Sequence, residues 1–345
     1  MAALILEIER AAQSTSERSE LGSVYIGGGT PTVLSSELLF AVLAAVTRSL
    51  GVEPDCEVTI EANPGTVDAP KLAALRQAGF NRLSLGVQSL DDDLLRALGR
   101  IHTADEALVA FDVARAAGFA NLGIDLMFAL PGQDMRDWRR TLEAAVGLGP
   151  EHVSLYELSI DEGTRFAELH AQGMLSLPDE DTKVEMYELA IALLTCSGFE
   201  HYEVSNFARP GFRSRHNQVY WRNEPYHGFG AGATSYLGGE RACRLRDPMR
   251  YIEEVESGRD AIESRERLTG RALLAETIIQ RLRMLEGIDL AGFAMETGVD
   301  LRSEFDAEID TLSRRGLVEV SDGRLRVTRT GLLLMNDVAM EFLSE

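Results

Sequence analysis

Short apolar segments alternate with longer amphipathic ones between residues 20 and 160. Five of the apolar segments have the length of buried β-strands and end at glycine or a polar residue: Val24–Ile26, Val58–Ile60, Leu83–Val87, Leu122–Ile124 and Val153–Tyr156. The amphipathic segments predict helices at residues 36–50, 68–79, 91–117 with a break near Gly99, and 134–148. This order predicts an α/β fold with consecutive parallel strands.

The residues that follow these strands favour one kind of α/β fold. After Gly27, polar strand-end residues recur at intervals of 27–37 residues, at Glu61, Gln88, Asp125 and Glu157. The carboxyl ends of parallel strands share one rim, and polar groups there are typical of a βα barrel whose ligand binds at that rim. A Rossmann-like sheet is the alternative, although its G-x-G-x-x-G fingerprint is absent from the first βα turn.

The second half of the chain has a different pattern. Residues 163–198 predict two helices, and residues 200–245, rich in glycine and aromatic residues, predict a folded loop or short strands near a ligand. Helices at 270–285, 289–296 and 301–315, a strand pair at 317–321 and 324–328, and a helix at 329–343 resemble a winged-helix module. We therefore expect a barrel at 1–205, a connecting segment at 206–265 and a winged-helix-like domain at 266–345.

Charge narrows the possible partners. The chain of 345 residues has 34 basic and 55 acidic residues, a net charge of −21, which disfavours binding to nucleic acid. The segment from Arg271 to Glu345 has 9 basic and 14 acidic residues, which argues against a winged-helix regulator. Three cysteines far apart and no apolar run of membrane length predict a soluble, cytoplasmic protein with no integral membrane segment.

Glycines and strand-end polar residues supply the first candidate site. Consecutive glycines at Gly27–Gly29, before Thr30, let backbone groups approach a ligand, or they form a tight βα turn. Glu61 can accept hydrogen bonds from ribose hydroxyls or an ammonium group, or it forms a loop salt bridge. Gln88 and Asp125 are the equivalent groups further along the chain, and several such groups on one rim require partners.

Two further segments contain candidate ligand-binding residues. Arg100, close to His102, suits a carboxylate, or it is an exposed interhelical arginine. The hexapeptide from His216 to Trp221 can line a planar aromatic ligand, with His216 donating a hydrogen bond or coordinating iron. Alternatively its rings anchor a structural loop.

Six motifs taken together resemble one family. The chain contains Gly-Gly-Gly-Thr-Pro-Thr, Glu-Ala-Asn-Pro-Gly-Thr, Gly-Val-Gln-Ser, Gly-Arg-Ile-His, Ile-Asp-Leu-Met followed by Leu-Pro-Gly, and His-Asn-x-x-Tyr-Trp. In this order they resemble the HemW family, the haem chaperone branch of the radical SAM coproporphyrinogen III oxidase-like proteins. The resemblance implies a partial βα barrel, a C-terminal winged-helix-like domain, and haem-acceptor proteins as partners.

The resemblance also implies ligand contacts. The S-adenosylmethionine contacts of the family correspond to Gly28, Gly29, Thr30, Glu61, Gln88, Arg100 and Asp125. The hexapeptide is implied to handle haem, with His216 as candidate iron ligand and Tyr220 and Trp221 against the ring face. Arg213, Arg215 and Arg222 are candidates for the haem carboxylates.

The sequence departs from the family pattern in its cysteines. Cys-x-x-x-Cys-x-x-Cys, which holds a [4Fe–4S] cluster in the family, does not occur in this chain, and Cys56, Cys196 and Cys243 lie in different predicted elements. We expect that the first barrel strand, the cluster ligands and an aromatic contact to S-adenosylmethionine are missing, through real loss or a start codon assigned too late. Ser214 and Thr234 stand where relatives often have Cys and His, which leaves His216 and His227 as histidine candidates.

Two functions therefore remain in competition. The first is a haem chaperone-like protein that binds haem and S-adenosylmethionine, without a cluster in this chain. The second is an oxygen-independent coproporphyrinogen III oxidase-type oxidoreductase of porphyrin biosynthesis, which requires the cluster. No catalytic residue is assigned.

Overall fold

The computed structural model describes residues 1–14 and 20–343. The chain divides into two compact units, each built from separate stretches of sequence. One unit contains Met1–Gly22, Ala41–Pro54 and Arg215–Glu345, and the other contains Ser23–Phe40 and Asp55–Ser214.

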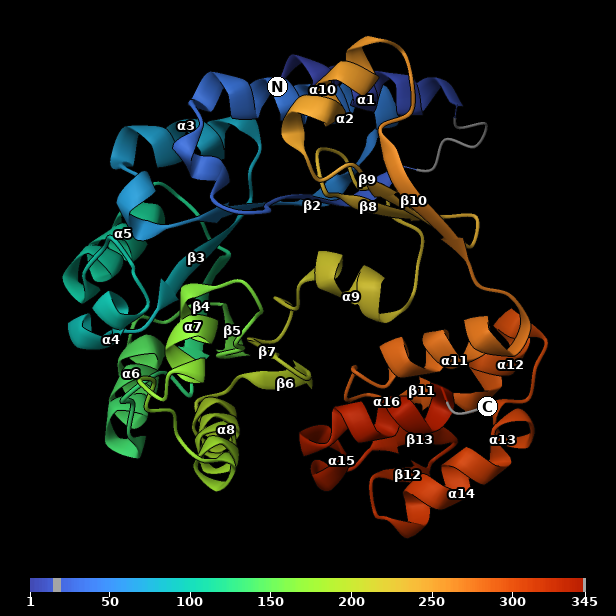
Figure 1. Ribbon diagram of the computed structural model, residues 1–345. Helices are drawn as coiled ribbons and strands as arrows, with labels where there is room; N and C mark the ends of the chain where they lie inside the picture. Colours follow the sequence, from blue (N-terminus) through green and yellow to red (C-terminus); the bar gives the residue numbers. More distant parts are fainter. Residues whose placement is uncertain (15–19, 344–345) are drawn as a thin grey trace. The chain divides into compact units, whose positions relative to one another are not determined.

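Seven strands form the main sheet, in the order β1-β2-β3-β4-β5-β7-β6 (Figure 1). Their bounds are β1 Leu21–Ile26, β2 Val52–Ala62, β3 Arg82–Gln88, β4 Leu122–Phe128, β5 His152–Glu157, β6 Glu200–Glu203 and β7 Asn206–Ala208. Strands β2 to β5 pair in parallel, and β7 runs antiparallel to β5 and β6. The sheet curls as an open half-barrel, so the carboxyl ends of β2 to β5 share one rim.

Helices connect these strands. They and two short 3-10 turns are η1 Pro31–Val33, α2 Ser36–Leu50, η2 Pro64–Thr66, α3 Ala69–Ala78, α4 Asp92–Ala97, α5 Ala104–Ala116, α6 Met135–Gly147, α7 Arg165–Ala171 and α8 Glu180–Cys196. Local sequence explains many of their starts. The side chains of Asp68, Asp91, Thr103 and Asp134 accept hydrogen bonds from the first backbone N–H groups of α3, α4, α5 and α6.

The two faces of the parallel strands differ in chemistry, because successive side chains point to opposite sides. Apolar side chains such as Ile60 and Leu85 are fully buried on the side of the helices, where α5 contacts β3 and β4. The inner face is polar and carries Glu57, Thr59, Glu61, Arg82, Ser84, Asp125, His152 and Ser154. A half-barrel with this inner face can bind a polar ligand.

A buried ion pair stabilises the inner face. Arg82 Nη1 lies 3.6 Å from Glu57 Oε2, and both side chains are almost fully buried. The same guanidinium donates to the Asn121 side chain (3.3 Å) and to the carbonyl of Phe212 (3.1 Å). These extra acceptors offset part of the cost of burying the charge.

The other unit contains a small antiparallel sheet and a helix pair. Its sheet has the order β10-β9-β8, with bounds β8 Thr234–Leu237, β9 Glu240–Arg244 and β10 Ile262–Arg267. Helices α1 Ala2–Ser14 and α10 Pro248–Glu256 contact each other. Glu7 of α1 accepts hydrogen bonds from Arg244 (2.8 Å), Tyr251 (2.6 Å) and the N–H of Gly230 (2.9 Å), which ties these elements together.

The C-terminal part of this unit has its own apolar core around Ile278, Phe293, Phe305 and Leu325. Its elements are α11 Gly270–Arg281, β11 Ile288–Asp289, α12 Leu290–Thr297, α13 Leu301–Glu304, α14 Asp306–Arg314, β12 Val318–Ser321, β13 Arg324–Val327, α15 Arg329–Leu333 and α16 Met335–Leu343. The predicted strand pair is confirmed as β12 and β13, and β11 adds a third strand. This arrangement is the winged-helix-like domain.

Most predicted elements are confirmed, and three predictions of element type or length are wrong. The break near Gly99 separates α4 from α5, as predicted. The hexapeptide lies on a short helix, α9 Arg215–Trp221, and not on a loop or strand. The helices predicted at 301–315 and 329–343 are each interrupted, at Phe305 and Leu334, whose backbones leave the helical conformation. Phe305 is fully buried, so packing decides this interruption.

Candidate functional site

The glycine loop after β1 is the first part of the rim. Gly28 and Gly29 have φ angles of +87° and +125°, and a Cβ on either would meet nothing within 4 Å. Gly27 is constrained differently, because a Cβ there would lie 2.6 Å from the Tyr25 ring and 2.8 Å from the Glu61 carboxylate. The loop therefore exposes bare backbone on an open side and packs closely on Glu61 on the other.

Glu61, at the end of β2, is fixed by two donors. The hydroxyl of Tyr25 donates to Glu61 Oε1 at 2.7 Å, and the N–H of Gly28 donates to Oε2 at 3.2 Å. Burial, reinforced by the Glu61 charge, raises the pKa of Tyr25, so the hydroxyl keeps its proton. Tyr25 was not among the residues selected from the sequence, since it lies within a strand and not at its end.

Three polar side chains converge on the space above Gly86 in β3. Measured from the position of a Cβ on Gly86, Asn63 Oδ1 lies at 2.7 Å, Gln88 Nε2 at 3.0 Å and Arg100 Nη2 at 3.6 Å. Gln88 has a φ of +65°, which is unusual for a residue other than glycine, and it lies where the β3–β4 register shifts. The structure thus brings together Gln88 and Arg100, with the unpredicted Asn63 beside them.

Asp125, in β4, has neighbours that orient it. Ser84 Oγ donates to Asp125 Oδ1 at 3.1 Å, and Ser154 also hydrogen-bonds the carboxyl group. Burial raises the pKa of Asp125 to about 6, and the two serines oppose this shift. Burial lowers the pKa of Arg100, whereas the charge of Asp125 raises it.

Side chains connect the two loops that flank this rim. Asn63 Nδ2 donates to Thr30 Oγ1 at 2.7 Å, and the hydroxyls of Thr32 and Thr66 lie 2.6 Å apart. Lys71 Nζ donates to the carbonyl oxygens of Thr32 and Leu34, the latter at 2.7 Å. We call Asn63, Thr66 and Lys71 the loop brace, because each fixes the segment that follows the glycines.

The hexapeptide forms a second cluster, in the other unit. On α9, His216 Nε2 lies 3.0 Å from the hydroxyl of Tyr220, and the two rings meet edge to face with centroids 5.0 Å apart. Tyr220 also contacts the Tyr226 ring, with centroids 4.6 Å apart. Burial lowers the pKa of His216 to about 4, so the imidazole is neutral at pH 7.

Trp221 lies at the end of α9 and has a cation against it. The Arg283 guanidinium carbon lies 5.1 Å from the centroid of the Trp221 ring. The indole nitrogen is buried and has no hydrogen-bond partner among the residues that the structure describes. One ring face of Trp221 is therefore occupied by a side chain of the C-terminal domain.

The three arginines expected to bind carboxylates already have acidic partners. Arg213 pairs with Glu200 at 2.9 Å, Arg215 with Glu53 at 2.7 Å, and Arg222 with Glu286 at 4.0 Å. His227 stacks on Phe229, with centroids 5.5 Å apart, and Thr234 Oγ1 lies 3.2 Å from Cys243 Sγ.

The cysteines do not assemble. Cys56 is buried in β2, Cys196 is exposed at the end of α8, and Cys243 lies in β9. Within residues 1–14 and 20–343, no three Cys, His, Asp or Glu side chains gather in a way that could hold a metal ion.

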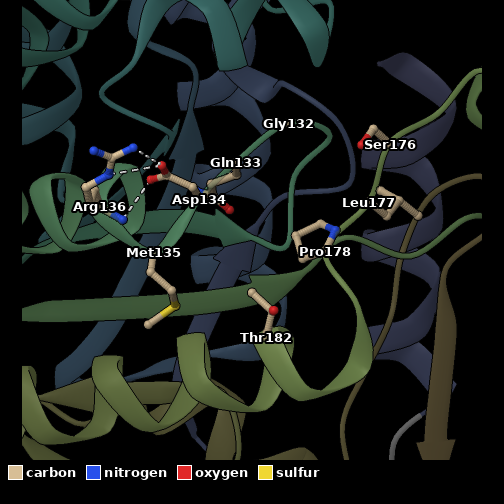
Figure 2. Close-up of a pocket in the computed structure, with 9 residues that line it drawn as sticks. All are labelled: Gly132, Gln133, Asp134, Met135, Arg136, Ser176, Leu177, Pro178 and Thr182. Carbon is tan, nitrogen blue, oxygen red and sulfur yellow. Dashed lines mark hydrogen bonds and ion pairs between the residues drawn. The ribbon is translucent and has the colours of Figure 1, made fainter.

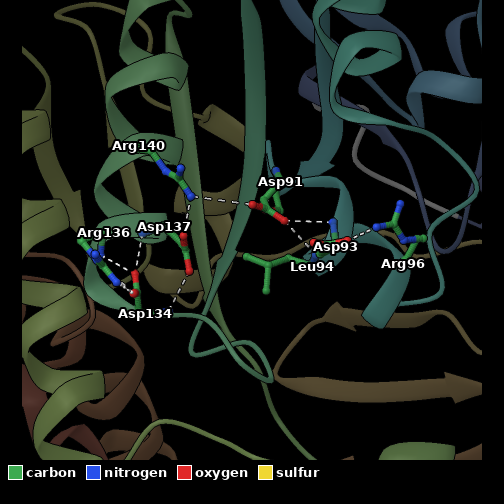
Figure 3. A network of polar contacts seen from close by, with 9 residues as sticks. Asp91, Asp93, Leu94, Arg96, Asp134, Arg136, Asp137 and Arg140 are labelled. Carbon is green, nitrogen blue, oxygen red and sulfur yellow. Dashed lines mark hydrogen bonds and ion pairs between the residues drawn. The ribbon is translucent and has the colours of Figure 1, made fainter.

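A surface pocket of about 500 Å³ lies outside both clusters (Figure 2). It is lined by residues 132–136, 176–178 and Thr182, and its charged side chains, Asp134 and Arg136, pair with each other at 3.0 Å. Nearby, Arg140 lies 2.5 Å from Asp137 and 3.9 Å from Asp91, which connects α6 to the loop after β3 (Figure 3). These contacts connect the segments that follow β3 and β4.

Comparisons with known proteins identify the class. The model described as "Radical SAM superfamily" matches residues 4–145, and "HemN C-terminal domain" matches residues 268–334. The solved structure of coproporphyrinogen III oxidase (HemN) from Escherichia coli, a radical SAM enzyme, superposes with a TM-score of 0.84 at 25% identity, covering 99% of this chain and 82% of that one. The half-barrel with its polar rim is therefore the partial βα barrel of a radical SAM protein.

Sequence relatives specify the family. The chain is 38% identical to "Heme chaperone HemW" of Bacillus subtilis over 94% of its length and 86% of that protein. It is 36% identical to the protein of the same name from Mycobacterium tuberculosis, over 99% of this chain and 85% of that one. The chain belongs to the HemW family. The prediction from the motifs is confirmed, and HemW is favoured over the oxidase alternative.

Membership of the radical SAM superfamily implies S-adenosylmethionine and a [4Fe–4S] cluster. The rim has groups whose chemistry suits the nucleotide: open backbone at Gly28 and Gly29, carboxylates at Glu61 and Asp125, and the partly buried Arg100. The described residues do not fit the cluster, because their thiols lie in three separate elements. None of the helices in the described part of the chain has the length and apolar composition needed to cross a membrane.

Proposed function

We propose that this chain binds S-adenosylmethionine at the half-barrel rim, carries haem on the hexapeptide segment, and delivers that haem to acceptor proteins in the cytoplasm. One observation supports the nucleotide site most. Arg100 is partly buried, lies near Asp125, and has no hydrogen-bond or ion-pair partner within residues 1–14 and 20–343. A guanidinium in that state is a receptor for a carboxylate.

The remaining rim groups match the rest of the ligand. Arg100 and Gln88 would donate to the methionyl carboxylate, and Glu61 and Asn63 Oδ1 are acceptors for the ammonium group. Asp125, oriented by two serines, would accept from the ribose hydroxyls. Bound S-adenosylmethionine would supply the sulfonium that radical SAM chemistry cleaves, and the residues named here only bind and orient it.

Calorimetric titration with S-adenosylmethionine tests the rim. Arg100→Met should weaken binding by about 10-fold or more, because a charge-assisted hydrogen bond is lost. Arg96→Met is the matched control, since Arg96 is exposed and pairs with Asp93, which is also exposed. Equal affinity for wild type and Arg100→Met would refute the site.

The haem site depends on the cluster of His216, Tyr220 and Tyr226. It offers a neutral imidazole beside aromatic rings, which a flat apolar macrocycle with an iron centre requires. Titration with haemin, followed by the Soret band, should show binding that His216→Ala weakens about 10-fold. His170→Ala on the exposed helix α7 is the control. Unchanged haemin affinity per folded molecule in His216→Ala would show that the cluster is only structural.

A further inference from the structure

Two arginines differ from all others in the described residues. Most arginines there form an ion pair or a hydrogen bond, and most of the remainder are exposed. Only Arg100 and Arg283 are partly buried and have neither kind of polar partner among those residues. Arg100 faces the proposed nucleotide site. Arg283, in the C-terminal domain, contacts the hexapeptide helix, which suggests a second carboxylate receptor.

The surroundings of Arg283 contain donors without an acceptor. Its guanidinium lies over the Trp221 ring, whose buried N–H has no partner in the described part of the chain. The neighbouring cations are satisfied, since Arg281 pairs with Glu296 at 2.6 Å and Arg222 with Glu286. A ring face restricts the guanidinium to one plane and leaves its N–H groups free, which prepares it for bidentate binding of a carboxylate.

Arg283 is not required simply to attach α9. The end of that helix is already fixed to α11 by Asn223 Nδ2, which donates to Thr277 Oγ1 at 3.0 Å, and by Arg281 Nε, which donates to the carbonyl of Arg222 at 3.2 Å. A third contact, made by an unpaired charge, adds little to the stability of this attachment. A ligand carboxylate, in contrast, would give the Arg283 guanidinium the acceptor that it lacks among the described residues.

We propose that Arg283, held by Trp221, binds a propionate carboxylate of the haem carried on the hexapeptide segment. This inference rests on the proposed haem function and assigns the C-terminal domain a part in ligand recognition. His216 and Trp221 are five residues apart on α9, about 7.5 Å along the helix axis and about 140° around it, so their side chains leave different faces of the helix. Of a macrocycle bound at His216, only the propionates that extend from its edge would reach Arg283. The arginines paired with Glu200, Glu53 and Glu286 are not needed as receptors.

The test compares haemin with haemin dimethyl ester, which has no free carboxylate. Wild type should bind haemin about 10-fold more tightly than the ester, and Arg283→Gln should lower haemin affinity to that of the ester while leaving ester affinity unchanged. Arg283→Lys should retain part of the preference, because a charge remains without the planar fork. Arg302→Gln, an exposed arginine of the same domain, is the control and should behave as wild type.

The possible outcomes separate the two proposals. If wild type binds neither compound, the haem function fails and this inference fails with it. If wild type binds both equally, or Arg283→Gln weakens both to the same extent, haem binding stands and the carboxylate receptor is refuted. Thermal unfolding of each variant shows whether a loss of affinity reflects misfolding.

Discussion

At the scale of single residues, burial of Asp125 in the half-barrel favours ligand binding but lowers the stability of the folded protein. The Asp125 carboxyl group loses its proton near pH 6 in the folded protein, and near the ordinary value of 3.8 when unfolded. Between these pH values the folded state binds more protons, so stability falls as the pH rises toward 6. Above pH 6 the folded chain holds a buried anion that Ser84 and Ser154 compensate only in part.

Asp125→Asn should therefore stabilise the protein while weakening ligand binding. We expect the free energy of unfolding at pH 7 to rise by about 1–3 kcal/mol, and most of this gain to be lost near pH 4, where the carboxyl group is protonated in the folded protein and about half protonated in the unfolded one. Urea denaturation at the two pH values measures this. Asp112→Asn, on the exposed side of α5, is the control. A stabilisation equal at both pH values would contradict the stated cause.

At the scale of elements, the rim depends on the loop brace. The Lys71 ammonium donates to two carbonyl oxygens of the segment after the glycines, and no hydrophobic contact can replace those donors. Lys71→Met should leave both carbonyls without this donor and cost about 1–3 kcal/mol of stability.

The same variant should accelerate amide hydrogen exchange at residues 28–34 and lower the affinity for S-adenosylmethionine several-fold, by about 3-fold to 10-fold. Lys183→Met is the control, because Lys183 pairs with Glu157 and Glu180, away from the glycine loop in the sequence. Unchanged exchange in this loop would show that the brace does not order it.

These elements also show what sequence reasoning can reach. The strand ends at Glu61, Gln88 and Asp125 were predictable, because parallel strands place their carboxyl ends on one rim. Tyr25, Asn63 and Lys71 were not, since their partners lie 33–39 residues away and depend on which strands and loops adjoin. The short helix α9 was missed because packing on α11, and not local propensity, stabilises seven residues as a helix.

At the scale of the whole molecule, the two units interleave along the chain. Residues 1–22 and 41–54 pack with residues 215–345, and the half-barrel takes the intervening stretches. Such an arrangement depends on contacts between distant segments, which periodicity does not encode. The fold class can be predicted from the order and type of the helices and strands alone. The prediction of an α/β fold with a partial βα barrel is therefore confirmed. The domain boundaries at 205 and 265 stay a prediction.

The positions of the three cysteines predict how this chain behaves toward iron and sulfide. A [4Fe–4S] cluster needs three thiolates around one cubane, but Cys56 is buried in β2 while Cys196 and Cys243 lie in α8 and β9. Anaerobic reconstitution with iron and sulfide should therefore give far less than one cluster per chain, measured by bound iron and the cluster absorption band. The variant with all three cysteines changed to Ser should retain the same residual iron. S-adenosylmethionine affinity should be equal before and after reconstitution, because the rim contacts involve no thiol. One cluster per chain, lost on replacing a single cysteine, would contradict the prediction.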